Sequence, residues 1–346
     1  MKIENFEINK TSNVFIIAEL SANHNGSIEV AKETIRAAKR AGADCIKLQT
    51  YTAETLTLDS DKDDFKIKGT IWEGKNLYQM YQEAYTPWEW HKELFDVAKS
   101  EGLICFSSPF DNSAVDFLET LDVPAYKIAS FEITDIPLIE YAASKMKPMI
   151  LSTGIASLED IELAIDTIRQ TGNNDITLLK CTSSYPAPIE EANMIMLHEF
   201  KRKFNVKVGL SDHTIGSIVP IVAVCFGAEV IEKHFILDRS IGGPDASFSM
   251  NETEFKEMVL AVRDAEKAIG KVAFEITELQ AKGRQFSRSL YVSKDIKKDE
   301  LITLDNIKSV RPGYGLHPKF LPEILGKKVN QDLEKGTRMA LSFIAE

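Results

Sequence analysis

The sequence predicts an α/β fold, namely a closed (β/α)8 barrel followed by a small β-rich domain. Over the first 270 residues, short apolar runs rich in β-branched residues alternate with helical stretches, as in a parallel barrel of this length. Eight runs have strand character: residues 14–18, 45–48, 103–106, 125–129, 149–151, 176–180, 206–210 and 230–231. An open doubly wound sheet is the alternative. That fold places a glycine-rich phosphate loop after its first strand, whereas the corresponding segment here, residues 21–26, has a single glycine, Gly26.

The predicted helices repeat apolar residues at i, i+3 and i+4, most clearly over residues 30–41, 88–99 and 158–169. Ser157, with Asp160 three residues later, is typical of a capped helix start.

The alternation is interrupted between residues 50 and 87. A long connection after a barrel strand lies at the catalytic end and is typical of a lid or a specificity element. This one is rich in aromatic residues, and packing of these rings on the barrel alone is the alternative interpretation. The residues are Tyr51, Trp72, Tyr78, Tyr81 and Tyr85.

The alternation ends near residue 272. We expect a barrel domain over residues 1–272, a linker over 273–284 and a β-rich domain over 285–346, in which glycine and proline mark tight turns. A core of that size usually needs a neighbour for full stability. From Lys282 onward the net charge is +5, against −16 for the rest of the chain. A basic domain beside an acidic one could close over an anionic substrate, and a solvated surface without a role is the alternative.

Composition argues against two classes of partner. The 346 residues are 44% hydrophobic and 27% charged, with a net charge of −11, so we expect no nucleic acid partner. No long charge-free apolar run is present, so we expect no membrane span. The first ten residues lack the apolar segment of a secretory signal, and the four cysteines are scattered. We therefore expect a cytoplasmic protein with reduced, buried cysteines.

Polar residues concentrate where the barrel strands should end. His213 and His234 follow two consecutive candidate strands, and barrel enzymes place their chemistry at the carboxyl ends of strands. Two imidazoles there can share one divalent transition metal, with water completing an open site. Lys47 and Lys127 lie in strands, where an unpaired buried charge is costly. We expect them to bind an anion such as a phosphate, helped by nearby hydroxyls, and structural ion pairs are the alternative.

Several short motifs carry a resemblance to a known family. They are IIAELSANHNGS at 16–27, KLQT at 47–50, YKIAS at 126–130, LSTG at 151–154, GLSDHT at 209–214, EKHF at 232–235, GPD at 243–245 and RPG at 311–313. In this order and spacing, the chain resembles the sialic acid synthase family over essentially its whole length. Members of that family condense phosphoenolpyruvate with an N-acylated sugar. The resemblance implies a TIM barrel followed by an antifreeze-like (SAF) domain, which caps the partner subunit's site in a domain-swapped homodimer.

The resemblance also implies roles for single residues. His213 and His234 would hold Mn²⁺ or Mg²⁺, and imidazole ligands favour manganese. Glu19 matches a catalytic carboxylate that orients or deprotonates water. The positions that match phosphoenolpyruvate ligands are Lys47, Ser108, Lys127, Ser130, Ser152, Ser183 and Ser211, with Ser183 in place of the usual asparagine. The positions expected to face the sugar are Gln49, Tyr185, Glu232, Asp245 and, from the partner subunit, Arg311.

The insertion over residues 69–91 resembles that of the branch that uses 2,4-diacetamido-2,4,6-trideoxy-L-altrose to make pseudaminic acid. Synthesis of N-acetylneuraminate or legionaminate from a mannosamine-type sugar is the alternative. Two other classes stay open. An aldolase would form a Schiff base on Lys127 and survive chelation. A non-catalytic sugar-binding protein would bind its ligand without releasing phosphate.

Overall fold

The structure is a computed structural model that describes residues 2–4, 6–8, 13–69 and 73–345. Contacts divide the chain into two compact units, Met1–Gly270 and Lys271–Glu346. In the described part of the chain, no helix combines the length and the apolar character needed to cross a membrane.

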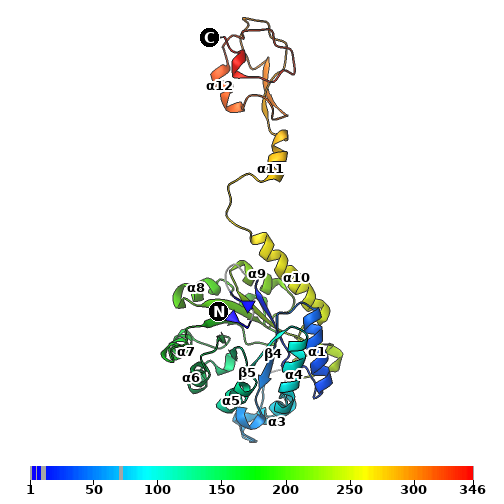
Figure 1. Cartoon of the computed structure of the whole chain (residues 1–346), viewed down its shortest axis with the longest axis vertical. Coiled ribbons are helices and arrows are strands. Elements are labelled where there is room, and N and C mark those ends of the chain that lie inside the picture. Colours follow the sequence, from blue (N-terminus) through cyan, green and yellow to red (C-terminus); the bar gives the residue numbers. More distant parts are fainter. Residues whose placement is uncertain (1, 5, 9–12, 70–72, 346) are drawn as a thin grey trace. The chain divides into compact units, whose positions relative to one another are not determined.

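The first unit contains a closed barrel of eight parallel strands, hydrogen-bonded in the order β10-β3-β4-β5-β6-β7-β8-β9 (Figure 1). Each strand begins inside one of the predicted apolar runs, so the predicted (β/α)8 fold is confirmed. The strands are β3 (Phe15–Glu19), β4 (Cys45–Thr50), β5 (Ile104–Pro109), β6 (Tyr126–Ile128), β7 (Met149–Ser152), β8 (Ile176–Cys181), β9 (Lys207–Asp212) and β10 (Val230–His234).

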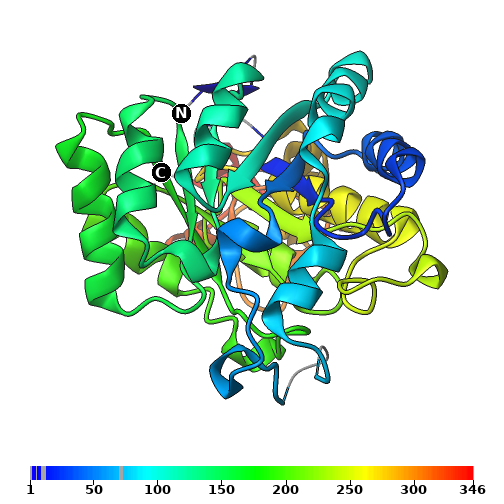
Figure 2. The ribbon, with the colours of Figure 1, turned by 90° about the horizontal axis from the view of Figure 1, so that it is seen from below.

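The helices of this unit lie outside the strands (Figure 2). The three most clearly predicted stretches correspond to α1, α4 and α7, and Ser157 caps α7 in a reciprocal capping box with Asp160. The helices are α1 (Ile28–Arg40), α4 (Trp88–Ser100), α5 (Asn112–Thr120), α6 (Ile136–Ser144), α7 (Leu158–Gln170), α8 (Met196–Phe204), α9 (Ile218–Cys225) and α10 (Glu252–Ile269), with α2 (Ala53–Leu56) and α3 (Leu77–Ala84) in the insertion.

Apolar side chains fill the amino-terminal end of the barrel. Phe15, Phe106 and Ile150 meet in its interior with other strand residues. A short hairpin, β1 (Lys2–Ile3) and β2 (Phe6–Glu7), adds Ile3 to this cluster and was not predicted. The carboxyl end of the lumen is polar instead, so the apolar pattern stops before the strands do. This explains why β4, β5, β9 and β10 run two or three residues beyond their predicted ends.

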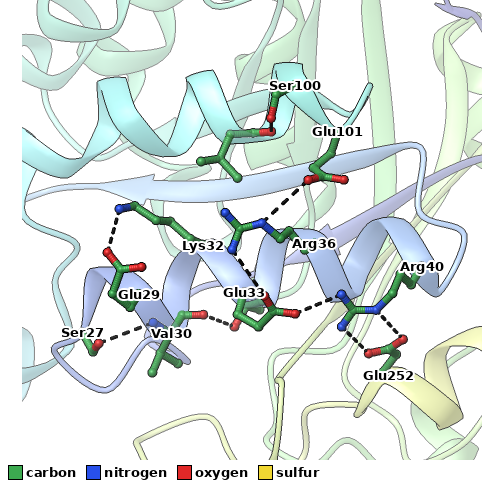
Figure 3. Close-up of polar contacts among 12 residues, drawn as sticks. Ser27, Glu29, Val30, Lys32, Glu33, Arg36, Arg40, Ser100, Glu101 and Glu252 are labelled. Atoms are coloured by element: carbon green, nitrogen blue, oxygen red, sulfur yellow. Dashed lines mark hydrogen bonds and ion pairs between the residues drawn. The ribbon is translucent and has the colours of Figure 1, made fainter.

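Ion pairs join neighbouring helices near β3 and β10, the first and last strands of the barrel. Arg40 of α1 pairs with Glu252 of α10 at 2.8 Å, and Arg36 lies 3.7 Å from Glu101 at the end of α4 (Figure 3). These contacts are half exposed, so each adds little stability alone. They fix the helix that follows β3, the strand that ends in Glu19.

The cysteine prediction is partly wrong. Cys45, Cys105 and Cys181 are buried free thiols as expected, but Cys225 at the end of α9 is exposed.

The second unit has a small apolar core of its own, which includes Leu290, Ile307 and Val329. Its described residues include an antiparallel pair, β11 (Ser289–Val292) with β12 (Ile307–Val310), together with isolated bridges, 3-10 turns and the short helix α12 (Leu321–Ile324). The segment predicted as a linker contains a helix, α11 (Glu278–Gly283), which begins at a Thr277 capping box.

Candidate active site at the carboxyl end of the barrel

A buried network of charges lies where β3, β4, β6 and β10 end. The ammonium group of Lys47 lies 2.6 Å from Glu19 and 3.0 Å from Glu232. Lys127 lies 3.4 Å from the other oxygen of Glu232, which also accepts a 3.0 Å hydrogen bond from Ser211. Gln49 donates to Glu19 at 2.9 Å. The structure therefore joins six of the predicted residues in one cluster.

Glu232 is the centre of this cluster. It had been expected to face the sugar, and in the structure it lies between the two lysines. Burial raises the pKa of its carboxyl, but Lys127 and Lys47 lower it further, so the pKa falls to about 2. Glu232 is therefore charged at neutral pH and holds both ammonium groups in the barrel mouth. An anionic substrate could take over this role from Glu232.

Hydroxyl groups line the next part of the mouth. Ser108 at the end of β5 and Ser152 at the end of β7 are buried, and neither hydroxyl has a hydrogen-bond partner. A buried hydroxyl without a protein partner is uncommon and points to a position where a ligand binds. Ser130 accepts a 3.1 Å hydrogen bond from the Gly154 amide, and its hydroxyl also forms a hydrogen bond with the Cys181 side chain. The predicted serines therefore offer donors in positions suited to a phosphate.

Gly154 makes this arrangement possible. A Cβ atom on residue 154 would lie 2.0 Å from the hydroxyl of Ser183 and 2.7 Å from that of Ser130. Only glycine allows these two hydroxyls to converge.

His213 and His234 lie beside this cluster, with ring centroids 5.3 Å apart. The Nδ1 atom of His213 lies 3.0 Å from the carbonyl of Thr182. A ring that donates through Nδ1 presents Nε2 as its lone-pair nitrogen. The Nδ1 atom of His234 is buried without a hydrogen-bond partner. Burial, together with the nearby His213, lowers the pKa of His234 well below its ordinary value, so this ring is neutral.

These features fit a divalent metal ion. A neutral imidazole with an unpartnered nitrogen is a ready ligand, and a backbone carbonyl on the far nitrogen of His213 is the usual support for a metal-bound ring. Within the described ranges, no set of three or more His, Cys, Asp or Glu side chains is arranged to hold a metal. Two imidazoles would therefore leave several coordination positions to water and substrate.

Aromatic side chains pack against the histidine pair. The Tyr185 ring lies 4.4 Å from the His213 ring and 5.1 Å from the Phe248 ring. The carboxylate of Asp245 lies 3.7 Å from Nδ1 of His234 and accepts a 2.5 Å hydrogen bond from Ser21. Tyr185 and Asp245 thus stand beside the two imidazoles.

The insertion also reaches this region. Tyr51 is buried, and its ring contacts Tyr81 of α3 at 5.8 Å and Phe110 at 5.1 Å. Tyr78 instead lies on the outside, where its hydroxyl donates to Glu54. Trp72 lies outside the described residues. Only some of the predicted aromatic residues therefore approach the mouth.

Glu132 was not predicted. It closes the 3-10 turn η2 (Ser130–Glu132) after β6, and its Oε2 atom is buried without a hydrogen-bond partner. Burial raises its pKa to about 7, although Lys127 opposes this shift. The sequence signal for it is its position two residues after the YKIAS motif. An acid of this pKa beside the lysines is suited to proton transfer at neutral pH.

Arg311 belongs to the second unit, where it is exposed and precedes a cis proline. The structure thus gathers the predicted barrel residues at one mouth, and Arg311 lies on the surface of the other unit.

Comparison with known proteins places this architecture in a family. The sequence matches the NeuB family over residues 34–273 and the SAF domain over residues 287–337. It is 52% identical over 336 residues to a pseudaminic acid synthase of Campylobacter jejuni, with 97% of each chain covered. It is 38% identical to an N,N'-diacetyllegionaminic acid synthase of Legionella pneumophila, covering 95% of this chain and 94% of that one. The crystal structure of the spore coat polysaccharide biosynthesis protein SpsE of Bacillus subtilis superposes with a TM-score of 0.68 at 33% identity, covering 100% of this chain and 99% of that one. The chain therefore belongs to the NeuB family, with the site residues at the ends of its eight barrel strands and a SAF domain after the barrel.

Proposed function

We propose that the protein is a pseudaminic acid synthase. It condenses phosphoenolpyruvate with 2,4-diacetamido-2,4,6-trideoxy-L-altrose and releases phosphate by cleavage of the C–O bond. The observation that carries this proposal is 52% identity over nearly the full chain to a pseudaminic acid synthase, against 38% to a legionaminic acid synthase.

The lysine and serine cluster is the proposed site for phosphoenolpyruvate. Lys47 and Lys127 supply two buried amino groups. Burial lowers the pKa of Lys47 to about 7, so an anion bound beside it would favour its charged form. Ser108 and Ser152 supply hydroxyls that have no hydrogen-bond partner inside the protein. Ser130, Ser183 and Ser211 complete the set. Charge-assisted hydrogen bonds in a desolvated pocket would hold the phosphate and carboxylate groups in a fixed orientation.

His213 and His234 are the proposed metal ligands, with Mn²⁺ favoured over Mg²⁺ because imidazole is a poor ligand for magnesium. A bound divalent ion would supply Lewis-acid polarisation of the open-chain sugar aldehyde. Tyr185 and Asp245 lie beside the imidazoles, and Gln49 is bonded to Glu19, the register partner of His234. These three side chains would orient the sugar. Their rigid support by Phe248, Ser21 and Glu19 favours a single orientation of the aldehyde.

Two carboxyl groups can move protons at this mouth. Lys47 and Gln49 hold the Glu19 side chain in place, which suits it to orient the water that adds to C2 of phosphoenolpyruvate. Glu132, with its pKa near 7, can donate or accept a proton at neutral pH. The residues therefore divide into anion binding, sugar orientation and proton transfer.

We also propose that the SAF domain closes the barrel mouth of a second subunit in a swapped homodimer. Exposed apolar side chains on several strand-end loops support a protein cover, among them Phe131, Ile155 and Ile215. Arg311 would then contact an acetamido carbonyl of the sugar bound in the partner subunit.

The direct test is a phosphate-release assay with phosphoenolpyruvate and a panel of sugars. Release with the diacetamido-trideoxy-altrose and not with N-acetylmannosamine supports the proposal. Chelation with EDTA should abolish turnover and Mn²⁺ should restore it. Turnover that survives chelation, together with a substrate adduct that borohydride traps on Lys127, would establish the aldolase alternative.

Mixing Arg311→Ala protein with a Lys127→Met variant tests the swap. Activity should reappear in mixed dimers, and its absence despite proven subunit exchange argues against a cap in trans.

A further inference from the structure

Two buried charged residues outside the lumen lie beside the histidine pair. Asp212 and Lys233 directly precede His213 and His234, and they are register partners at the ends of β9 and β10. Side chains alternate along a strand, and Leu210 and Ile231, two residues earlier, belong to the cluster packed between strands and helices. Asp212 and Lys233 therefore face the helix layer. Each side chain is only 1% exposed.

This ion pair holds the backbone of the residue that follows His213. The Lys233 ammonium group lies 2.5 Å from one Asp212 oxygen and donates to the Thr214 carbonyl at 2.6 Å. The other Asp212 oxygen accepts a 2.9 Å hydrogen bond from the Thr214 amide. Both polar backbone groups of Thr214 are thus bound to the pair.

The Asp212–Lys233 ion pair lies where the hydrogen-bond ladder between β9 and β10 ends. The β9–β10 register ends at Asp212 and Lys233, so no ladder pairing extends to His213 opposite His234. Beyond this point, the His213 carbonyl accepts a 3.0 Å hydrogen bond from the Ala187 amide. Together with the ion pair, this hydrogen bond fixes the two peptide units that follow His213.

A contribution to the stability of the fold does not by itself explain a buried ion pair at this position. Removing two charges from water is expensive, and neutral or apolar side chains of similar size often replace a buried ion pair without loss of stability. The contacts of this pair are specific to the backbone at a proposed metal ligand. We propose that Asp212 and Lys233 are positioning residues that set His213 against His234, so that both imidazoles can bind one divalent cation. This inference rests on the metal site of the proposed function.

The test uses the full-length protein and measures Mn²⁺ binding by electron paramagnetic resonance, without substrates, beside thermal unfolding. The main variant is the double change Asp212→Asn with Lys233→Met, which removes both charges and leaves none unpaired. We expect it to fold and to bind Mn²⁺ roughly 10- to 100-fold more weakly, as is typical when support of a metal ligand is lost. Phosphoenolpyruvate binding in the absence of metal should stay unchanged.

The matched control is Lys201→Met with Glu229→Gln, which removes a 2.7 Å Lys–Glu pair at the other end of β10. Its Mn²⁺ affinity should equal that of the unmodified protein. A folded double variant at Asp212 and Lys233 with normal Mn²⁺ affinity would overturn the inference. If that variant does not fold, Lys233→Met alone decides, because it removes the donor to the Thr214 carbonyl while Asp212 still accepts from the Thr214 amide. Normal Mn²⁺ affinity in this variant also rejects a positioning role. If the unmodified protein binds no Mn²⁺, the proposed metal site itself is wrong.

Discussion

Lys127→Met is the substitution that isolates anion binding most cleanly. The Lys127 side chain is 2% exposed, and its ammonium group lies 3.4 Å from Glu232. Without it, Glu232 still keeps Lys47 at 3.0 Å and Ser211 at 3.0 Å, so no buried carboxylate is left unpaired. Lys47→Met would instead remove the contact shared by Glu19 and Glu232, and such a loss typically costs about 3–5 kcal/mol of stability.

The expected effect follows from the chemistry of one lost contact. A hydrogen bond to a charged group contributes about 1.5–3 kcal/mol. The dissociation constant for phosphoenolpyruvate should therefore rise roughly 10- to 150-fold. Titration calorimetry with phosphoenolpyruvate measures this directly, and circular dichroism verifies the fold of the variant.

Lys207→Met is the matched control. Lys207 begins β9 at the opposite end of the barrel, where it lies 3.8 Å from Asp175. Its replacement should leave phosphoenolpyruvate affinity unchanged. If folded Lys127→Met protein binds phosphoenolpyruvate as tightly as the control, Lys127 has no part in anion recognition, and the assignment of this mouth to phosphoenolpyruvate loses its main support.

Two further predictions concern Glu132 and Gly154. Burial raises the pKa of Glu132 from 4.5 to about 7. As the pH rises, the unfolded chain therefore loses the Glu132 proton before the folded chain does. The free energy of unfolding should fall by about 3 kcal/mol between pH 4.5 and 7. Glu132→Gln should remove that part of the pH dependence in denaturant unfolding, and an unchanged profile would contradict the raised pKa. Gly154→Ala should weaken phosphoenolpyruvate binding about tenfold, or ~1.4 kcal/mol, since its Cβ would displace the Ser183 and Ser130 hydroxyls. Gly283→Ala, where no atom lies within 4 Å, is the control, and equal affinities in the two variants would rule out the crowding argument.

The barrel could be predicted from the sequence because each strand begins with an apolar run that packs on both faces. Strand ends were less predictable. Residues such as Lys47 and Glu232 are polar but fully enclosed, because they pair with each other across strands that are far apart in the chain. Hydrophobic periodicity cannot show such pairing, so the predicted strand at 230–231 stops before Glu232, whereas Lys47 falls inside the predicted strand at 45–48.

The composition of the candidate site was largely predictable, but its internal contacts were not. The resemblance to a family identified residues one at a time. It did not reveal that Glu232 bridges both lysines, or that Asp212 and Lys233 brace Thr214 from outside the lumen. Glu132 was missed because it lies in a short 3-10 turn, where neither strand nor helix periodicity marks a buried acid. The helix α11 in the predicted linker depends on a local Thr277 capping box that composition alone did not suggest.

The central claim is that this mouth joins phosphoenolpyruvate to a sugar aldehyde with cleavage of the C–O bond. The most direct measurement uses phosphoenolpyruvate labelled with ¹⁸O at the oxygen that bridges C2 and phosphorus, together with 2,4-diacetamido-2,4,6-trideoxy-L-altrose and Mn²⁺. The account predicts that pseudaminic acid forms and that the label leaves with the phosphate, seen as an isotope shift in the ³¹P spectrum. Unlabelled phosphate, with ¹⁸O retained in the sugar product, would contradict it.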